Sequence, residues 1–292
     1  MSELQDTARR LLDEGTVQVV IGWEASHLGA RPVFVTSADD CDKLIFDTRC
    51  VHNLATFLNP RRVQVVALGK AAVVVKGCDA KAVAGLLREA QFERDAVVTI
   101  GVRCGGVVSE PSGLEPPALT ADNIAARCPG CDVREPASVD VLVGEAQPEP
   151  PVSASLNERI AELDALSPEE RFAFWTAELS RCTQCYACRQ ACPLCYCERC
   201  IVEKTQPQWI ETSPHPRGNF AWHLTRAQHL AGRCVGCGEC ERACPVGIPL
   251  GLINRKLQQV VHELYGYTVT DDPAVPAPIG AYATDDTQDF IK

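Results

Sequence analysis

Seven cysteines crowd the twenty residues from Arg181 to Cys200, RCTQCYACRQACPLCYCERC. Disulfides, zinc sites and iron–sulfur clusters all use cysteine, but each needs its own spacing. The stretch begins with the pattern Cys-x-x-Cys-x-x-Cys-x-x-x-Cys-Pro. Residues 234–245 repeat this pattern, the final proline included. A cysteine pattern that occurs twice with the same spacing indicates two metal-binding sites of the same type.

The doubled run has the spacing by which bacterial two-cluster ferredoxins hold two 4Fe–4S clusters, with the fourth cysteine of each run binding the other cluster. Two-residue gaps let a tight loop place three thiolates on one cluster, with backbone N–H groups turned toward the sulfides. The proline then turns the chain away. The predicted ligands are Cys182, Cys185, Cys188 and Cys244 for one cluster and Cys234, Cys237, Cys240 and Cys192 for the other.

Zinc and disulfides fit this pattern less well. Structural zinc takes two separated cysteine pairs or Cys/His sets, which leaves the third cysteine and the trailing Cys-Pro of each run unexplained. The total of 17 cysteines is odd, and cytosolic thiols stay reduced. Three cysteines, Cys195, Cys197 and Cys200, are surplus to the two runs. We interpret them as buried small apolar residues, with ligands of a further group as the alternative.

Six more cysteines are scattered over residues 1–145. Cys128 and Cys131 form a tight turn, RCPGC, and the others except Cys41 follow predicted strands or turns. Because ligands of α/β sheets gather at the carboxyl ends of strands, these cysteines can converge. Two interpretations stay open: scattered core cysteines, or a third cluster. Its ligands would be Cys104, Cys128 and Cys131 with Cys78 or Cys50. Cys41 has no partner signal and is interpreted as inert.

The elements that must position these residues follow from the apolar pattern. Strands are predicted at residues 17–23, 32–35, 62–68, 71–77 and 96–102, and helices at 80–91, 156–166 and 167–182. The strand–helix–strand order of residues 71–102 predicts an α/β domain with a partly parallel sheet. The glycine between strand and helix at Gly77 also offers an anion site at a helix N-terminus, although the G-x-G-x-x-G fingerprint of dinucleotide binding is missing.

Composition predicts the domain boundaries. The α/β domain spans residues 1–143, and GEAQPEPPVSAS at 144–155 has linker composition. Residues 156–270 form the two-cluster ferredoxin module with flanking helices, within a mainly helical C-terminal domain. The Pro/Ala/Asp-rich tail at 271–292 is expected to be extended over a partner or mobile. The long gap between the two cysteine runs contains a predicted helix before Cys234, and its Trp209 and Trp222 are interpreted as core packing.

Charge and hydropathy exclude several classes of protein. The formal net charge is −10 and no run of Lys or Arg occurs, which argues against a nucleic-acid groove. No apolar stretch approaches the roughly 18 residues of a membrane span. The N-terminus lacks the apolar region of a signal peptide, so we expect a cytoplasmic protein.

Two stretches resemble a known family. LGKAAVVVKGCDAKAVAGLL with VVTIGVRC resembles the beta-subunit domain of deazaflavin-coenzyme (F-420) reducing hydrogenases and of formate dehydrogenases. The doubled cysteine run looks like the dicluster ferredoxin part that is fused to that domain in formate-dehydrogenase beta subunits. The resemblance covers most of residues 15–265. It implies electron transfer between iron–sulfur centres and a redox partner. Some members bind FAD and reduce the deazaflavin coenzyme, and whether FAD binds here stays open.

We therefore expect an electron-transfer subunit of a multi-subunit anaerobic oxidoreductase, such as a hydrogenase, formate dehydrogenase or heterodisulfide-reductase-like complex. It would pass single electrons through two or three 4Fe–4S clusters, with no catalytic acid, base or nucleophile of its own. The alternative is a flavin-containing subunit that itself reduces a deazaflavin or nicotinamide. The other subunits of the complex are the expected partners. Trp209, Ile210 and Tyr267 are candidate docking residues, with a place in the core of the module as the alternative for each.

Overall fold

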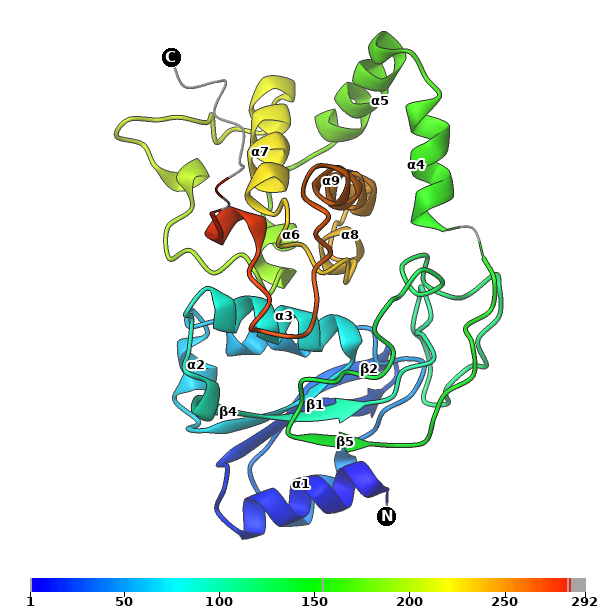
Figure 1. The fold of residues 1–292 in the computed structure, drawn as a ribbon, viewed down its shortest axis with the longest axis vertical. Helices are drawn as coiled ribbons and strands as arrows, with labels where there is room; N and C mark the ends of the chain where they lie inside the picture. Colours follow the sequence, from blue (N-terminus) through cyan, green and yellow to red (C-terminus); the bar gives the residue numbers. More distant parts are fainter. Residues whose placement is uncertain (1, 154, 283, 285–292) are drawn as a thin grey trace.

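A five-stranded sheet forms the base of the molecule in the computed structural model, which describes residues 2–153, 155–282 and 284 (Figure 1). The strands are β1 Val19–Ser26, β2 Gly29–Val35, β3 Ala71–Val75, β4 Val97–Val102 and β5 Val141–Val143, in the order β2-β1-β3-β4-β5. β2 is antiparallel to β1, and the other neighbours pair in parallel. The mixed α/β sheet expected from the sequence is confirmed.

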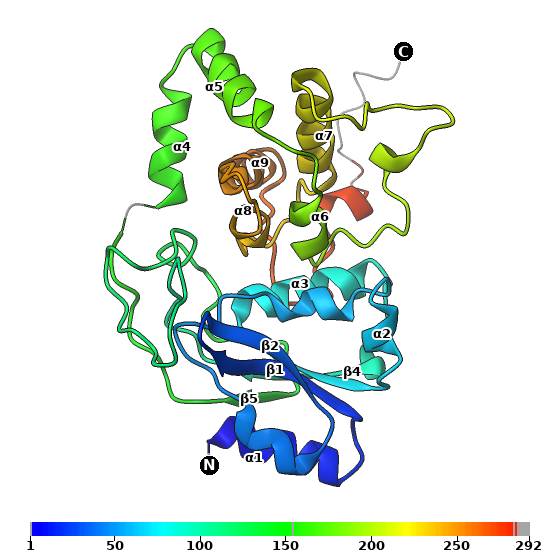
Figure 2. The same cartoon turned by 180° about the vertical axis from the view of Figure 1, so that it is seen from behind.

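Helices cover both faces of this sheet. They are α1 Glu3–Asp13, α2 Val63–Val66, α3 Gly77–Arg88, α4 Leu156–Asp164, α5 Pro168–Ser180, α6 Ala187–Ala191, α7 Pro216–His229, α8 Glu239–Arg242 and α9 Leu250–Tyr265. α1 lies on one face and α3 on the other, and α6 to α9 lie beyond α3 (Figures 1 and 2). Within the described ranges, no helix is both long enough and apolar enough to cross a membrane.

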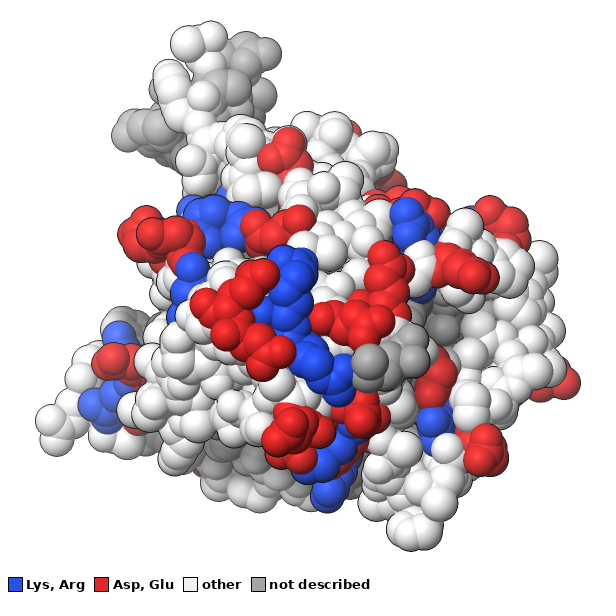
Figure 3. Space-filling model, turned by 90° about the horizontal axis from the view of Figure 1, so that it is seen from below, with Lys and Arg blue, Asp and Glu red and all other residues white. Residues whose placement is uncertain are grey.

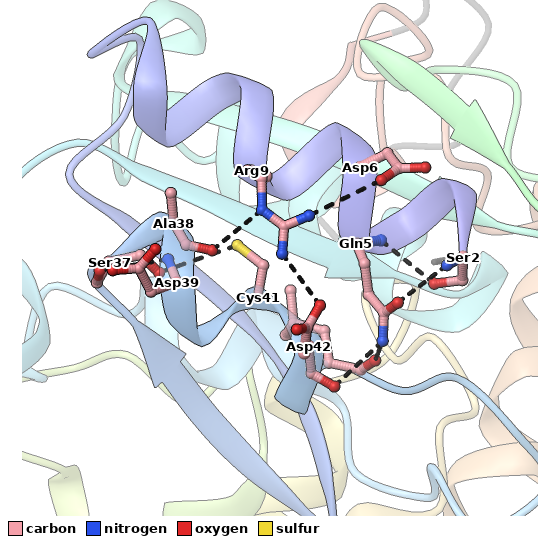
Figure 4. Close-up of polar contacts among 10 residues, drawn as sticks. Ser2, Gln5, Asp6, Arg9, Ser37, Ala38, Asp39, Cys41 and Asp42 are labelled. Atoms are coloured by element: carbon pink, nitrogen blue, oxygen red, sulfur yellow. Dashed lines mark hydrogen bonds and ion pairs between the residues drawn. The ribbon is translucent and has the colours of Figure 1, made fainter.

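Polar contacts fix α1 to the short 3₁₀ segment Ala38–Lys43 (Figure 4). Ser2 caps the helix, and its side chain and that of Gln5 form a reciprocal capping box. Gln5 also donates to the carbonyl oxygen of Leu44 at 3.0 Å. Arg9 donates to the carbonyl oxygen of Ala38 and pairs with Asp42 at 3.0 Å. The helix is therefore held by polar contacts of its first two turns and by its buried apolar face.

Charges of both signs alternate on the surface seen from the α1 side (Figure 3). Arg10 pairs with Glu14 on α1, and Lys43 pairs with Asp40 on the neighbouring 3₁₀ segment. Exposed pairs of this kind contribute little to stability. The two signs of charge are interspersed on this face, which carries no continuous basic surface (Figure 3).

The strand expected at residues 62–68 is wrong, because the segment forms the short helix α2. Val63 and Val66 are exposed there, and the backbone N–H of Ala67 donates to the carbonyl oxygen of Val63 at 2.9 Å. Valine favours a strand only where a sheet edge is free to pair with it. β3 follows directly and is already paired with β1 and β4 on its two sides, so neither side of β3 is free to pair with this segment. The three-residue strand β5 was not expected from the sequence.

One apolar core joins the sheet to the cysteine-rich part of the chain. Leu194, Leu230, Val235 and Val269 pack in the same cluster of buried residues as the strands and α3. Leu194 lies directly on α3, since a side-chain carbon added at Gly85 would meet it at 3.1 Å. Arg233 forms an ion pair with Glu89 at the end of α3. The segments on either side of residues 144–155 therefore share one interior.

The first part of the predicted tail is held against the chain itself. Asp271 is buried and accepts hydrogen bonds from the backbone of Ala137 at 2.7 Å and of Ser138 at 3.3 Å. Arg88 of α3 donates to the carbonyl oxygen of Asp272 at 3.0 Å. Residues 283 and 285–292, the remainder of that tail, lie outside the described residues.

A buried ion pair locks the turn between β3 and α3. Lys76 lies 2.9 Å from Asp79, and both side chains are almost fully excluded from solvent. Asp79 also accepts hydrogen bonds from the backbone of Leu54 at 2.7 Å and of Lys76 at 3.0 Å. The Lys76 ammonium lies 4.2 Å from the ring centre of Trp23. Although burial opposes its charge, the neighbouring Asp79 carboxylate raises the pKa of Lys76.

Replacing Asp79 should therefore destabilise the protein strongly. Asp79→Ala leaves a buried ammonium and two backbone N–H groups without their acceptor, a loss of about 3–5 kcal/mol. We expect thermal unfolding of the anaerobic protein to show a fall in Tm of roughly 6 °C or more. Asp122→Ala is the control, because Asp122 is exposed and should change Tm by no more than about 2 °C. Equal Tm values for the two variants would contradict the structural role of the pair.

Candidate iron–sulfur centres

The two cysteine runs adopt the same backbone conformation. Each Cys-x-x-Cys-x-x-Cys loop passes twice through the left-handed region, at equivalent positions. In the second loop these positions are glycines, Gly236 with φ 69° and Gly238 with φ 71°. In the first loop they are Gln184 with φ 52° and Tyr186 with φ 59°. Non-glycine residues rarely adopt this conformation, so the first loop must be held there by other contacts.

Side-chain hydrogen bonds hold the first loop. The Gln184 amide donates to Asn219 Oδ1 at 3.0 Å and to the carbonyl oxygen of Ser213 at 3.1 Å. It accepts from the Tyr186 hydroxyl at 3.1 Å. Asn219, at the start of α7, donates in turn to the carbonyl oxygen of Cys182 at 2.8 Å. The segment between the two runs thus shapes the first loop, which explains why residues 211–219 pack against it.

The first predicted ligand group is brought together in space. Cys182 lies within electrostatic range of Cys185 and Cys244, and Cys188 within range of Cys182 and Cys244. Backbone N–H groups already point at two of these sulfurs: Gln184 N lies 3.3 Å from Cys182 Sγ, and Ile248 N lies 3.4 Å from Cys244 Sγ. Cys244, from the second run, therefore joins the first three as the ferredoxin spacing requires.

The second predicted group lines a cavity of about 590 Å³. Its members are Cys192, Cys234, Cys237 and Cys240. The Asn254 amide of α9 donates to Cys240 Sγ at 3.4 Å, and its Oδ1 is buried without a partner. The cavity lies between α3 and the cysteine loops, where the two parts of the shared core meet.

Four cysteines of the N-terminal half line the same cavity, Cys78, Cys104, Cys128 and Cys131. They are mutual neighbours, since Cys104 is within electrostatic range of Cys78, Cys128 and Cys131. Cys78 opens α3 after β3, Cys104 follows β4, and the backbone of Cys131 closes the RCPGC turn onto Cys128 at 3.1 Å. The carboxyl ends of two parallel strands and one loop thus supply the four thiols, as expected for ligands of an α/β sheet.

Gly77 makes this convergence possible. A side-chain carbon at Gly77 would lie 1.7 Å from the carbonyl oxygen of Val133, so only glycine lets the cysteine loop pack there. Lys81 of α3 fixes the same loop by pairing with Asp132 at 2.6 Å. The backbone of Cys104 donates to the carbonyl oxygen of Arg134 at 2.9 Å. This close approach also covers the start of α3. Because the Asp79 carboxylate caps the turn, the anion site expected there is filled by the chain itself.

Cys50 and Cys41 do not join this group. Cys50 is fully buried in the core, and its sulfur accepts from the backbone of Asp47 at 3.4 Å. Burial raises the pKa of Cys50 to about 12. Cys41 is buried on the α1 side of the sheet, near Arg9. Of the two alternatives for a fourth ligand, Cys78 therefore has the required position and Cys50 does not.

The surplus cysteines have three different environments. Cys195 is half-buried beside Cys192 and within range of Cys234. Cys200 is half-buried in the cluster that contains Trp222. Cys197 is exposed, so its interpretation as a buried apolar residue is wrong. Its loop, residues 193–200, is too irregular to bury every small side chain.

Several of the cysteines in these groups are buried, and a buried thiolate needs positive charge beside it. Burial raises the pKa of Cys104, Cys188 and Cys234 to about 11. Thiols bind metal as thiolates, so holding a cluster requires compensating cations. Arg127 supplies one: burial opposes its charge, but Cys128 and Cys78 raise its pKa. Its guanidinium also lies over the Cys237 loop, with Nη1 3.1 Å from where Gly238 would carry a side chain.

The residues present fit 4Fe–4S clusters. The donor set is all thiol, the cavity is lined by eight cysteines, and buried polar groups beside it, such as Arg226 Nε, have no protein partner. Cluster sulfides are acceptors for such donors. In the described part of the chain, no three His, Cys, Asp or Glu side chains form a site for a single metal ion. A cluster differs from a single ion in that its four thiolates are spread around a larger group.

Comparisons with known proteins agree with this donor set. Residues 177–248 match the 4Fe-4S dicluster domain family. The F420-dependent formate dehydrogenase subunit beta of Methanocaldococcus jannaschii is 22% identical, over 91% of this chain and 90% of its own. The F420-dependent formate dehydrogenase 1 subunit beta of Methanococcus maripaludis is 24% identical, over 94% and 92%.

A solved structure of the F420-reducing NiFe hydrogenase complex from Methanosarcina barkeri contains a chain with 19% identity and a TM-score of 0.29, over 36% of this chain and 38% of that one. So low a score supports no argument about fold. The sequence relatives do confirm the resemblance expected above. Over about nine-tenths of its length, this chain is homologous to curated beta subunits of F420-dependent formate dehydrogenases, and it contains a 4Fe-4S dicluster domain.

Proposed function

We propose that this chain is an electron-transfer subunit of a multi-subunit oxidoreductase of the formate dehydrogenase kind. The observation that carries the proposal is the pair of cysteine loops, which have left-handed residues at equivalent positions. Cysteines of the second run and a third group of four thiols line one cavity. The named function of the two long relatives supports it. A chain that only used metal as a structural support would not need three ligand groups side by side.

The proposed ligand sets follow the grouping of the thiols. The first is Cys182, Cys185, Cys188 and Cys244; the second is Cys234, Cys237, Cys240 and Cys192; the third is Cys78, Cys104, Cys128 and Cys131. When bound, 4Fe–4S clusters supply reversible one-electron transfer. The chain contributes position, exclusion of water and N–H donors to sulfur, which set the reduction potential.

The three groups lie in a definite order. Cys237 of the second group is within electrostatic range of Cys78 of the third. Cys240 of the second group is within range of Cys188 of the first. The second group is therefore the middle one, and we propose that electrons pass between the sheet and the outer helices through it. The end groups are the natural points of exchange with partner subunits.

A partner must reach one of these end groups through an exposed surface. Of the three candidate docking residues, Trp209 is 67% exposed, which fits docking and makes its interpretation as core packing wrong. Ile210 is buried and therefore belongs to the core, the second of its two interpretations, in the cluster around Cys188 and Trp222. Tyr267 is half-buried beside the shared core. At the start of α3, where the sequence offered an anion site, the Asp79 carboxylate accepts from the backbone of Lys76, so we do not place a flavin phosphate there.

The third group can be tested with two matched cysteine variants. Cys78→Ser should remove one cluster, lowering the iron content from about twelve to about eight per chain. Cys50→Ser should leave it unchanged, because Cys50 lies in the core away from the cavity. Anaerobic iron and sulfide assays of the full chain measure both. Full loading of Cys78→Ser, or a wild-type content of only about eight irons, would remove the third cluster from the proposal.

The exchanged fourth ligands give a second test. Cys244→Ala should damage the same cluster as Cys185→Ala, and Cys192→Ala the same cluster as Cys237→Ala, because each run lends its last cysteine to the other. Electron paramagnetic resonance spectra of the reduced variants should therefore match in these two pairs. If Cys244→Ala instead resembles Cys237→Ala, the ligand sets are wrong.

The isolated chain should carry electrons without turning over a substrate. We expect dithionite to reduce its clusters, while formate, hydrogen and nicotinamide support no steady turnover unless partner subunits are added. Absorbance bleaching and an assay with an artificial electron acceptor measure the two properties. Sustained turnover by the chain alone would overturn the relay function and favour the flavin-containing alternative.

A further inference from the structure

Arg226 of α7 points into the interior between two of the cysteine groups. Its side chain is 4% exposed. Nη2 donates to the carbonyl oxygen of Cys188, in the first group, at 3.1 Å. The guanidinium also faces the thiols of Cys240, in the second group, and of Cys195. The arginine therefore contacts both cysteine loops and lines the cavity between them.

The polar contacts of this guanidinium are incomplete. Nε is buried and has no hydrogen-bond partner. Among the described residues, no ion pair joins Arg226 to an Asp or Glu. The other buried cations each have such a pair: Arg49, Lys76, Lys81 and Arg189. The neighbouring ionisable group on its helix is His223, which remains neutral, because burial and the charge of Arg226 lower its pKa to about 4. A buried arginine without a carboxylate needs negative charge from elsewhere.

The cysteine sulfurs around Arg226 supply that charge when they bind metal as thiolates. Cys240, Cys195, Cys192 and Cys188 stabilise its charged form, although burial opposes it. Two of these, Cys192 and Cys240, are proposed ligands of the middle group, and Cys188 is a proposed ligand of the first. One fixed cation is thus shared by two adjacent ligand sets. Arg226 also interacts with the Cys195 and Cys240 side chains by hydrogen bonding, and Nε is the donor that has no partner among the described residues.

We propose that Arg226 is a positioning and tuning residue shared by the first and second clusters, whose Nε–H donates to sulfur in the cavity and whose charge favours the reduced state of both. This inference rests on the proposed function. An electron added to either cluster increases the negative charge beside the guanidinium, so the cation stabilises the reduced form more than the oxidised form. Arginine suits the position because its planar guanidinium has several N–H donors: Nη2 donates to the carbonyl oxygen of Cys188 while the same group lines the cavity.

Reduction potentials of the full-length anaerobic protein test the proposal. Arg226→Gln removes the charge, and Arg226→Lys keeps the charge but has no counterpart of Nε. Arg217→Gln is the control, because Arg217 lies on the same helix but is exposed. Potentials are read from titrations with dithionite and redox mediators, followed by electron paramagnetic resonance. Iron content and the magnetic interaction between the reduced clusters are recorded for every variant.

For Arg226→Gln we expect at least a tenfold fall in the ratio of reduced to oxidised cluster at a fixed poise, for both clusters, which corresponds to about 59 mV for a one-electron couple. Arg226→Lys should shift in the same direction by less, and Arg217→Gln should not shift. Unchanged potentials in Arg226→Gln would overturn the proposal. If that variant does not load its clusters, Arg226→Lys decides, and wild-type potentials there would overturn it.

The proposed function can fail separately. If the fully loaded protein shows the Arg226 shifts but never exchanges electrons with partner subunits, the relay function is wrong and the tuning residue stands. If electrons pass to the partners while the Arg226 variants keep wild-type potentials, the relay stands and the tuning residue is wrong. A change in the magnetic interaction without a change in potential would show that Arg226 acts only on the packing of the two loops, which also contradicts the proposal.

Discussion

Thiols buried beside one another can carry negative charge only if positive charge is buried with them, and the structure is arranged around this requirement. Three cations lie along the cysteine groups. Lys76 comes from the turn between β3 and α3, Arg127 from the loop before Cys128, and Arg226 from α7. Each comes from a different part of the chain, so the groups acquire their counter-charges only when the whole chain has folded. Because the dielectric constant inside the shared core is low, the electrostatic interaction of each of these cations with a thiolate is stronger than it would be at the surface.

The two cysteine loops show two physical routes to one shape. In the second loop glycine adopts the left-handed backbone without steric cost. In the first loop Gln184 and Tyr186 are held there by side-chain bonds to Asn219 and to residues 211–213. The first loop has no glycine at these two positions. The long segment between the runs therefore has a structural role, since its contacts hold the first loop in the left-handed conformation.

The sequence was most informative where chemistry is local. The doubled cysteine run predicted eight ligand positions, and the alternation of apolar residues predicted four of the five strands. Convergence of the other thiols could not be read from spacing, because it depends on the approach of Val133 to Gly77 across two elements. The helix at 63–66 was missed because valine propensity says nothing about whether a sheet edge is free. The sequence left open which of Trp209 and Ile210 faces inward, because two adjacent apolar residues give no sign of their direction.

The shared core has a consequence for anyone who wishes to reuse this ferredoxin unit. Cutting the chain near residue 150 would expose Leu194, Leu230, Val235 and Val269 on one fragment and the face of α3 on the other. Both fragments would carry an apolar patch prone to association, and the cavity lined by Cys192, Cys234, Cys237 and Cys240 would lose one wall. The cysteine-rich segment is thus not an independent unit. A hybrid protein that includes the dicluster run must also include, or replace, the surface of the sheet domain against which the run packs.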